Sequence, residues 1–160
     1  MADAEIDRMD RKILETLQAE GRLSNVELAD RVTLSPSPCL RRVKRLEDDG
    51  VIAGYRAVLD RGAVGLGLTV FLEIKVGKHS RDNAAMLQKA LADMPEIVSC
   101  HIVSGTADFL AEVVVPDLAA YERFLLDRLL TVPTIEDVRS NFAIRMIKTA
   151  APLPLGHLGS

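Results

Sequence analysis

The hydrophobic pattern of this 160-residue chain changes its period near Gly50, and this change restricts the chain to few architectures. Before Gly50, apolar residues recur at intervals of three and four, which is the spacing of helices that bury one face. Beyond residue 65 they alternate with polar residues over long stretches, which is typical of strands in a sheet with one buried face. We therefore predict two unlike domains joined by a connector.

The first fifty residues carry the start and stop signals of three short helices. The first helix begins near Asp7, and the chain turns at Gly21. Ser24 and Glu27 have the spacing of a capping box at the start of a second helix. A tight turn leads to a third helix over 36–49, where two prolines fall in the first turn and break no backbone hydrogen bond. The last two helices predict a helix-turn-helix, an element typical of DNA-binding proteins.

The second half of the sequence predicts six elements in the order strand, helix, strand, strand, helix, strand. They cover 66–76, 86–94, 97–104, 108–115, 117–129 and 135–147. This is the order of a split ferredoxin-like unit, in which four antiparallel strands bury one face under two helices. Phe71 falls on the opposite face of the first strand, which hints at self-association through the sheet.

These patterns predict four segments along the chain. They are a helix-turn-helix domain at 1–50, an extended connector at 51–65, a ferredoxin-like domain at 66–149 and a flexible tail at 150–160. The tail is predicted from its prolines and glycines. The predicted fold class is α+β, with a three-helix, winged-type DNA-binding domain followed by a ferredoxin-like sandwich.

Composition and charge exclude several classes of protein. Apolar residues make up 48% of the chain and charged residues 27%, which is enough for a packed core. The formal net charge is -3, so any nucleic-acid binding depends on a local basic patch. No apolar run reaches the ~18–20 residues of a membrane span, and the acidic start is unlike a secretory or transit peptide. Two cysteines and three histidines form no disulfide framework and no metal cluster, so we expect a cytoplasmic protein without a metal.

The third predicted helix carries the most informative charge pattern. Between residues 31 and 46 there are five basic side chains and no acidic one. At ~100° per residue the apolar and basic residues separate onto two sides. The apolar side carries Cys39, Leu40, Val43 and Leu46; the polar side carries Ser37, Arg41 and Lys44, flanked by Arg42 and Arg45. Such a helix fits the ~12 Å major groove of B-DNA, where arginine binds guanine edges or phosphates. The alternative is a solvated face without a partner.

A turn and a strand in the second half hold further candidate residues. Gly105, Thr106 and Asp108 lie in a turn between two predicted strands. A hairpin alone explains the glycine, but Asp108 is also placed to accept hydrogen bonds from the ammonium group of a small zwitterion. Ser140 interrupts the apolar face of the last strand, either as a tolerated small residue or as part of a pocket. His101 and the two cysteines fit structural roles better than catalytic ones.

Several segments resemble the Lrp/AsnC family of feast/famine transcriptional regulators. In the first half these are 7–14, 22–29 and 34–43, the last containing Ser-Pro-Ser-Pro-Cys. In the second half, His-Ile-Val-Ser-Gly at 101–105 and Val-Pro-Asp at 115–117 are similar to the family's effector domain, the RAM domain. The resemblance extends to 148–155 and so covers nearly the whole chain.

The resemblance implies a one-component regulator that is not an enzyme and has no cofactor beyond a small effector, expected to be an amino acid. Its N-terminal domain is expected to bind double-stranded promoter DNA, with no membrane as a partner. Its C-terminal domain is expected to form homodimers that assemble further, often into an octamer. The amino acid is then expected between dimers, near the turn between the second and third strands.

Carried over position by position, the resemblance implies two sets of site residues. The DNA contacts are Ser24, Asn25, Ser35, Ser37, Arg41, Arg42, Lys44 and Arg45. The effector contacts are Gly105, Thr106, Asp108, Ser140 and Asn141. Gly105 and Asp108 match the first and last positions of the family's Gly-Asp-x-Asp motif, whereas Thr106 and Asn141 depart from the residues common at their positions.

Two other functions stay open on the residues alone. In one, the protein is a ligand-binding oligomer whose N-terminal helices bind only protein. In the other, a ferredoxin-like enzyme uses His101 and Asp108 as acid and base. A steep loss of DNA affinity with salt separates a regulator from the first alternative, because phosphate contacts release counterions. Turnover of a metabolite identifies the second.

Overall fold

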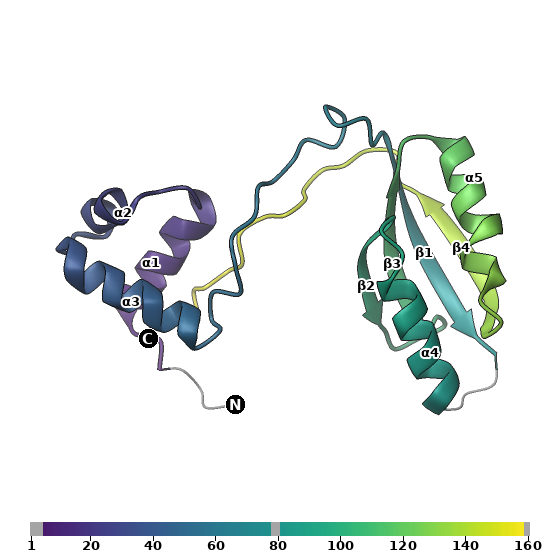
Figure 1. Cartoon of the computed structure of the whole chain (residues 1–160), viewed down its shortest axis with the longest axis horizontal. Helices are drawn as coiled ribbons and strands as arrows, with labels where there is room; N and C mark the ends of the chain where they lie inside the picture. Colours follow the sequence, from purple (N-terminus) through teal and green to yellow (C-terminus); the bar gives the residue numbers. More distant parts are fainter. Residues whose placement is uncertain (1–4, 78–80, 159–160) are drawn as a thin grey trace. The chain divides into compact units, whose positions relative to one another are not determined.

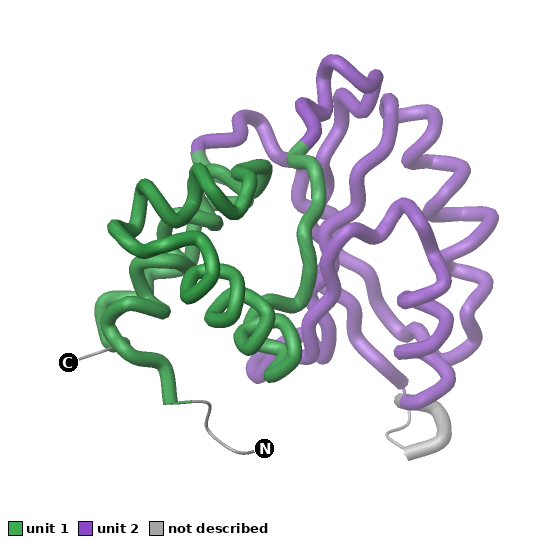
Figure 2. The backbone as a smooth tube through the Cα atoms, turned by 60° about the vertical axis from the view of Figure 1, so that its left-hand side comes forward, with its two compact units in different colours: residues 1–58, 148–160 green, residues 59–147 purple. Residues whose placement is uncertain are grey.

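The computed structural model describes residues 5–77 and 81–158 of the chain, which forms two compact units. The first unit contains residues 1–58 and 148–160, and the second contains residues 59–147 (Figure 2). The chain therefore leaves the first unit once and returns to it near its C-terminal end. Within the described residues, no helix is both long and apolar enough to cross a lipid bilayer.

Three helices make up most of the first unit, as predicted (Figure 1). They are α1 (Arg8–Ala19), α2 (Asn25–Val32) and α3 (Pro36–Asp48). The side chain of Asp7 caps α1, and Ser24 and Glu27 form the predicted capping box at α2. Gly50 follows α3 with a φ of +71°, a left-handed conformation that favours glycine and ends the helix.

The helices of the first unit bury one apolar stripe each. The core consists of Ile13, Leu14, Leu28, Ala29, Val32, Cys39 and Leu46. Burial raises the pKa of the Cys39 thiol, as expected for a cysteine that serves as a small apolar core residue. This core fixes which side of α3 faces inward.

The segment predicted as a flexible tail belongs to the first unit instead. The N–H of Leu153 donates to Gln18 Oε1 at 2.7 Å, and Gln18 Nε2 donates back to the Leu153 carbonyl at 3.3 Å. The Arg11 guanidinium donates to two further carbonyls of this segment, and Leu155 packs against the core. Its prolines and glycines produce an irregular path that α1 holds in place. Residues 159–160 lie outside the described part.

The second unit is the predicted ferredoxin-like fold, with both helices on one face of a four-stranded sheet (Figure 1). Its elements are β1 (Leu68–Val76), α4 (Arg81–Ala92), β2 (Ile97–Ile102), β3 (Phe109–Val115), α5 (Leu118–Asp127), the 3-10 helix η1 (Leu129–Thr131) and β4 (Ile135–Phe142). The strand order is β2-β3-β1-β4, and each neighbouring pair is antiparallel. Leu87 and Leu91 of α4 and Tyr121 and Phe124 of α5 form the core together with the buried side of the sheet.

The last strand ends at Phe142, earlier than the predicted end at residue 147. Phe142 pairs with Val70, and β1 begins only two residues before that position. The chain beyond Ala143 therefore has no partner strand in the described residues, although its apolar residues continue to alternate. Ile144 is accordingly fully exposed.

The sheet face opposite the helices is open. Phe71 is 40% exposed on this face, in agreement with its predicted orientation, and Leu110 is exposed on the neighbouring strand. Glu112 is directly opposite Phe71, and its carboxylate pairs with the Arg61 guanidinium at 2.7 Å. This face combines apolar area with polar groups that are already paired.

Candidate functional site

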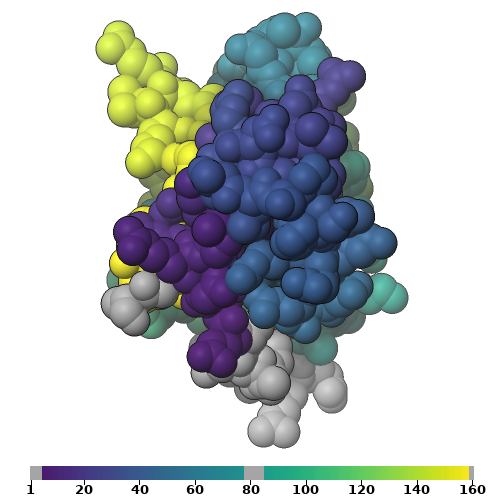
Figure 3. Space-filling model, turned by 90° about the vertical axis from the view of Figure 1, so that its left-hand side faces the viewer, coloured from purple at the N-terminus to yellow at the C-terminus, as the bar shows by residue number. Residues whose placement is uncertain are grey.

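The outer side of α3 carries Ser37, Arg41 and Lys44, as the helical spacing predicts. All three side chains are exposed, and in the described residues neither Arg41 nor Lys44 has an ion-pair partner. Figure 3 shows one face of the first unit, with α3 in blue. These two cations can therefore meet a polyanion without losing an internal partner.

Leu40 lies on this outer side, whereas the spacing predicts it on the buried side. It is 42% exposed, and Cys39 and Leu46 are wholly buried. The stripe of α3 that the other two helices cover is centred on Cys39 and Leu46, and Leu40 stands ~100° from Cys39 around the helix axis. The prediction for Leu40 is wrong because the packed stripe is narrower than the apolar sector of the sequence.

Arg42 and Arg45 are paired with carboxylates at the start of α1. Arg42 Nη1 lies 2.7 Å from Asp7 Oδ2 and 2.8 Å from Asp10 Oδ1. Arg45 also pairs with Asp10, which is wholly buried. The hydrogen bond to Asp10 raises the pKa of Arg42. Two of the four predicted cationic DNA contacts therefore have partners inside the first unit.

Asp10 is a residue of this site that the sequence analysis misses. It precedes Ile13 and Leu14 by three and four positions, so it lies on the buried stripe of α1. A carboxylate on the buried face of a helix requires cationic or hydrogen-bonding partners. The position of Asp10 on the apolar stripe is therefore the sequence signal that could have identified its role. By binding two arginines of α3, Asp10 fixes the rotation of α3 about its own axis.

The Asp7 carboxylate makes the stability of the first unit sensitive to acid. Hydrogen bonding from the Asp10 N–H, together with the Arg42 guanidinium, lowers the pKa of Asp7 from 3.8 to about 2. A carboxyl group with a lowered pKa in the folded state adds stability above its unfolded pKa, and this stability is lost as the pH falls from about 4 to about 2. Because the Asp7 side chain is 50% exposed, solvent screening limits the effect to about 1 kcal/mol or less.

We therefore expect the free energy of unfolding of the wild type to fall more steeply with acid than that of Asp7→Asn. Asparagine retains a capping oxygen but cannot ionise. Urea denaturation at intervals between about pH 2 and pH 5 measures both profiles. Parallel profiles of the two proteins contradict the role of the Asp7 charge.

The start of α3 offers free hydrogen-bond donors. Ser35 occupies the N-cap position, but its side chain makes no capping bond. Pro36 and Pro38 have no N–H, and the Cys39 N–H donates to the Ser35 carbonyl at 3.1 Å. Within residues 36–39, the Ser37 N–H is thus the amide left to bind an anion, beside the exposed hydroxyls of Ser35 and Ser37.

Ser24 and Asn25 lie at the start of α2, and both side chains have partners within the first unit. The Ser24 hydroxyl accepts the Glu27 N–H, and Asn25 Nδ2 donates to the Pro36 carbonyl at 2.8 Å. Asn25 Oδ1 is buried and has no partner in the described part of the chain. Asn25 therefore connects the start of α2 to the start of α3 and brings the predicted DNA contacts of both helices together.

The predicted effector residues Gly105, Thr106 and Asp108 lie in the turn between β2 and β3. Gly105 has a φ of +125°, which glycine adopts without strain. Asp108 Oδ2 accepts the Val76 N–H at 2.8 Å, and the Asp108 N–H donates to the Ile74 carbonyl at 3.0 Å. These two bonds fix the turn against the end of β1.

Ser140 and Asn141 follow each other in β4 and therefore point to opposite faces of the sheet. Ser140 is opposite Leu72, and its hydroxyl lies 2.6 Å from Tyr121 Oη on the helix-covered side. Asn141 Nδ2 donates to Glu73 Oε1 at 3.1 Å on the open side. The structure does not bring the five predicted effector residues onto one surface of a single chain.

Two domain families match this chain. The family described as winged helix-turn-helix DNA-binding matches residues 6–53, and the family described as Lrp/AsnC ligand binding domain matches residues 69–153. The leucine-responsive regulatory proteins of Escherichia coli and Klebsiella pneumoniae are each 43% identical to this chain over 144 residues, which is 90% of this chain and 88% of each relative.

Solved structures agree with these matches. A transcriptional regulator from Neisseria meningitidis in complex with L-Met has a TM-score of 0.90 and 42% identity, over 94% of this chain and 97% of that one. An AsnC family transcriptional regulator from Agrobacterium tumefaciens has a TM-score of 0.90 and 41% identity, over 94% of this chain and 98% of that one. Both cover the two units of the present chain.

The matches establish the class of protein. A helix-turn-helix DNA-binding domain is combined with a ligand-binding domain, so the protein is an effector-responsive transcription regulator. The hypothesis of an enzyme using His101 and Asp108 is wrong, because the matching proteins are regulators. Matched in both of its domains, and 43% identical to its relatives over nine-tenths of its length, the chain belongs to the Lrp/AsnC family of transcriptional regulators.

Proposed function

We propose that the outer side of α3 binds double-stranded promoter DNA in the major groove, and that an amino acid bound by the second unit changes this binding. One observation carries the first part: Arg41 and Lys44 are exposed on α3 without ion-pair partners in the described residues. Although the chain as a whole has a net charge of -3, these two side chains concentrate positive charge on one face of α3.

Four residues form the reading face of this proposal. Arg41 and Lys44 reach base edges or phosphates from the middle of α3. The Ser37 N–H and the hydroxyls of Ser35 and Ser37 bind a phosphate at the start of the helix, where the helix dipole favours negative charge. No cofactor takes part in these contacts.

The other predicted contacts act mainly by positioning. Arg42 and Arg45 hold α3 against Asp10, and because their side chains are 30% and 47% exposed they can also contact phosphates. Ser24 and Asn25 lie beside the start of α3 and approach the DNA backbone. Their hydrogen bonds within the first unit fix the orientation of α2 relative to α3, and recognition of a DNA sequence requires such a fixed orientation.

DNA binding by this chain requires more than one copy. One α3 offers few charged contacts. Linking two or more DNA-binding domains in one oligomer raises the overall affinity for DNA without new contacts in each domain. The open face of the sheet exposes Phe71 and Leu110, apolar area that a second copy covers. We therefore expect homodimers that assemble further, to an octamer.

The experiment for DNA binding is a salt titration of the full-length protein. Duplexes are selected by the protein from a random-sequence pool and labelled for fluorescence anisotropy. The slope of log affinity against log salt concentration is expected to be steep, at about -0.9 for each phosphate contacted. A slope near zero contradicts phosphate contacts and hence the proposal.

Asp108 supports an amino acid as the effector. Its Oδ2 accepts the Val76 N–H, and a carboxylate at the mouth of this turn can also accept hydrogen bonds from an ammonium group. The similar Neisseria meningitidis regulator was crystallised with L-Met. Asn141 lies on the open side of the sheet, where a second copy of the chain completes the ligand site, whereas the Ser140 hydroxyl faces the helix-covered side.

A screen of the twenty common amino acids by thermal denaturation is expected to find at least one that raises Tm, because a ligand of the native state stabilises it. Asp108→Asn is expected to weaken binding of that amino acid at least about tenfold, since a charge-assisted hydrogen bond is lost. Asparagine retains an acceptor for the Val76 N–H, so Tm without ligand is expected to change little. The control is Asp127→Asn, at an exposed position of α5. An undiminished ligand shift in Asp108→Asn contradicts the ammonium contact.

A further inference from the structure

Leu40 is an exposed apolar side chain at the flank of the reading face, between that face and the buried stripe of α3. It precedes Lys44 by four residues and follows Ser37 by three, so the three side chains form one stripe along α3. The core of the first unit does not require it, because Cys39 and Leu46 are wholly buried and fill the interior side of this helix. Its side chain is 42% exposed and is therefore available to a ligand of this side of the helix.

Leu40 lines a hollow of about 550 Å³ on the outer side of α3. Arg41 and Lys44 line the same hollow, and Asp48 and Asp49 line its end near the helix C-terminus. Phosphates are attracted to the basic part of this hollow and repelled from the acidic end. The charges therefore favour DNA over the first part of α3, where Leu40 lies beside Arg41 and Lys44.

The chemistry of the major groove selects a partner for this leucine. Thymine presents a C5-methyl group there, and none of the other three bases carries a methyl group. Contact between an alkyl side chain and a methyl group lowers the free energy of the complex, because apolar surface is removed from water. Contact with a donor or acceptor that is left unpaired raises the free energy of the complex. We propose that Leu40 recognises thymine through its methyl group, next to the base pair that Arg41 contacts. This inference rests on the proposed placement of α3 in the major groove.

The test removes the methyl group alone. In a duplex selected by the wild-type protein, each thymine is replaced in turn by deoxyuridine, and affinity is measured by fluorescence anisotropy. Each half of the DNA site bound by one copy of α3 is expected to contain one thymine whose replacement lowers the affinity of the wild type about fourfold. This factor corresponds to the burial of one carbon group. Leu40→Ala is expected to bind the thymine duplex more weakly and to show no further loss with deoxyuridine at that position.

The matched control is Leu153→Ala, which shortens another exposed leucine of the first unit, 70% exposed. This variant is expected to keep the full loss of affinity with deoxyuridine. Equal losses in the wild type and in Leu40→Ala, or no loss at any thymine in the wild type, overturn the role of Leu40. If Arg41→Ala binds the same duplex as tightly as the wild type, the placement of α3 itself is wrong, so the two failures are distinguishable.

Discussion

Arg41→Ala is expected to weaken DNA binding by the proposed dimer at least about 30-fold while leaving the free energy of unfolding unchanged. A good side-chain contact in the major groove contributes about 1–3 kcal/mol, and the two heads of a dimer lose it together. Arg41 is exposed and has no ion-pair partner in the described part of the first unit, so its removal leaves no buried charge behind.

Fluorescence anisotropy at one fixed salt concentration measures this loss, and urea denaturation measures the stability. The matched control is Arg123→Ala, which removes the same charge from an exposed position of α5. We expect its affinity to stay within about twofold of the wild type. Equal affinities of the two variants contradict DNA binding by this side of α3. A joint loss of stability and affinity in Arg41→Ala shows that the helix is rotated relative to this description.

Local signals are sufficient to predict the elements of both units. The capping box at Ser24 and Glu27 and the alternation over 66–76 depend on residues close in sequence, and the structure confirms the elements they predict. The end of an element depends on a partner that is distant in sequence. The last strand stops at Phe142 because β1 begins near its partner residue, which alternation alone cannot reveal.

The roles of the arginines on α3 are not predictable from helical spacing. Arg41 and Arg42 are adjacent in sequence, yet Arg42 is bound to a buried carboxylate and Arg41 is not. The difference arises from how α1 packs against α3, which places Asp10 beside one flank of the helix. Leu40 was misplaced for the same reason, since the width of the buried stripe is set by packing.

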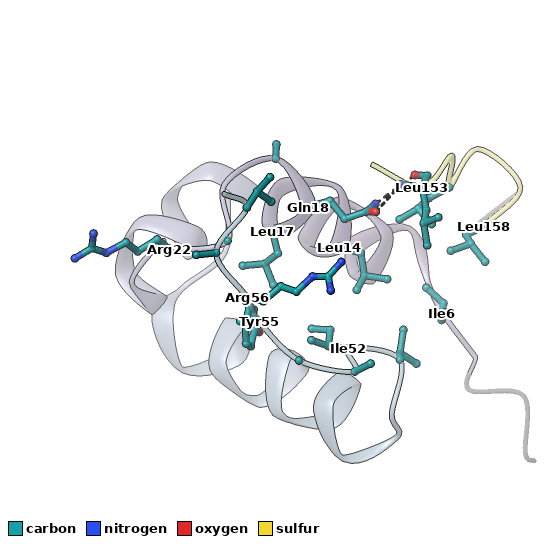
Figure 4. Close-up of a pocket in the computed structure, with 18 of the residues that line it drawn as sticks. Ile6, Leu14, Leu17, Gln18, Arg22, Ile52, Tyr55, Arg56, Leu153 and Leu158 are labelled. Atoms are coloured by element: carbon teal, nitrogen blue, oxygen red, sulfur yellow. Dashed lines mark hydrogen bonds between the residues drawn. The ribbon is translucent and has the colours of Figure 1, made fainter. Parts of the chain in front are cut away.

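The C-terminal segment and the effector residues show two further limits. Composition predicts disorder for the segment after residue 150, but Gln18 binds both backbone groups of Leu153 (Figure 4). This segment also lines an apolar groove of about 930 Å³ with residues of α1 and the connector. The predicted effector residues are a different case, because Ser140 and Asn141 face opposite sides of one sheet. Local patterns in one sequence cannot show which faces of the sheet a ligand site uses.

The ion pairs of the first unit account for how an acidic domain presents a basic face. Asp7 and Asp10 pair with Arg42 and Arg45 on the flank of α3 that faces α1, so two of the domain's acidic groups are held away from Arg41 and Lys44. Among residues 5–77 and 81–158, Arg41 and Lys44 have no ion-pair partner. The positive face therefore depends on the same carboxylates that orient the helix.

Asp10→Ala is expected to lower the free energy of unfolding of the first unit by about 3 kcal/mol. Removing one partner of a buried ion pair costs about 3–5 kcal/mol, because the other charge is left uncompensated. The lower end applies here, since the side chains of Arg42 and Arg45 are 30% and 47% exposed and can partly reach water. The Asp7 N–H also loses the Asp10 carboxylate that completes the capping box of α1.

Urea denaturation of the full-length variants measures this effect, with Asp30→Ala as the matched control. Asp30 is exposed on α2, so its removal is expected to change stability by less than about 0.5 kcal/mol. Adding Arg42→Met and Arg45→Met to Asp10→Ala is expected to recover part of the loss, because no charge is then left without its carboxylate and the methionine stems still pack. The single variant is also expected to bind the selected duplex more weakly, since α3 loses the contacts that set its rotation. An Asp10→Ala protein as stable as Asp30→Ala contradicts the positioning role of this carboxylate.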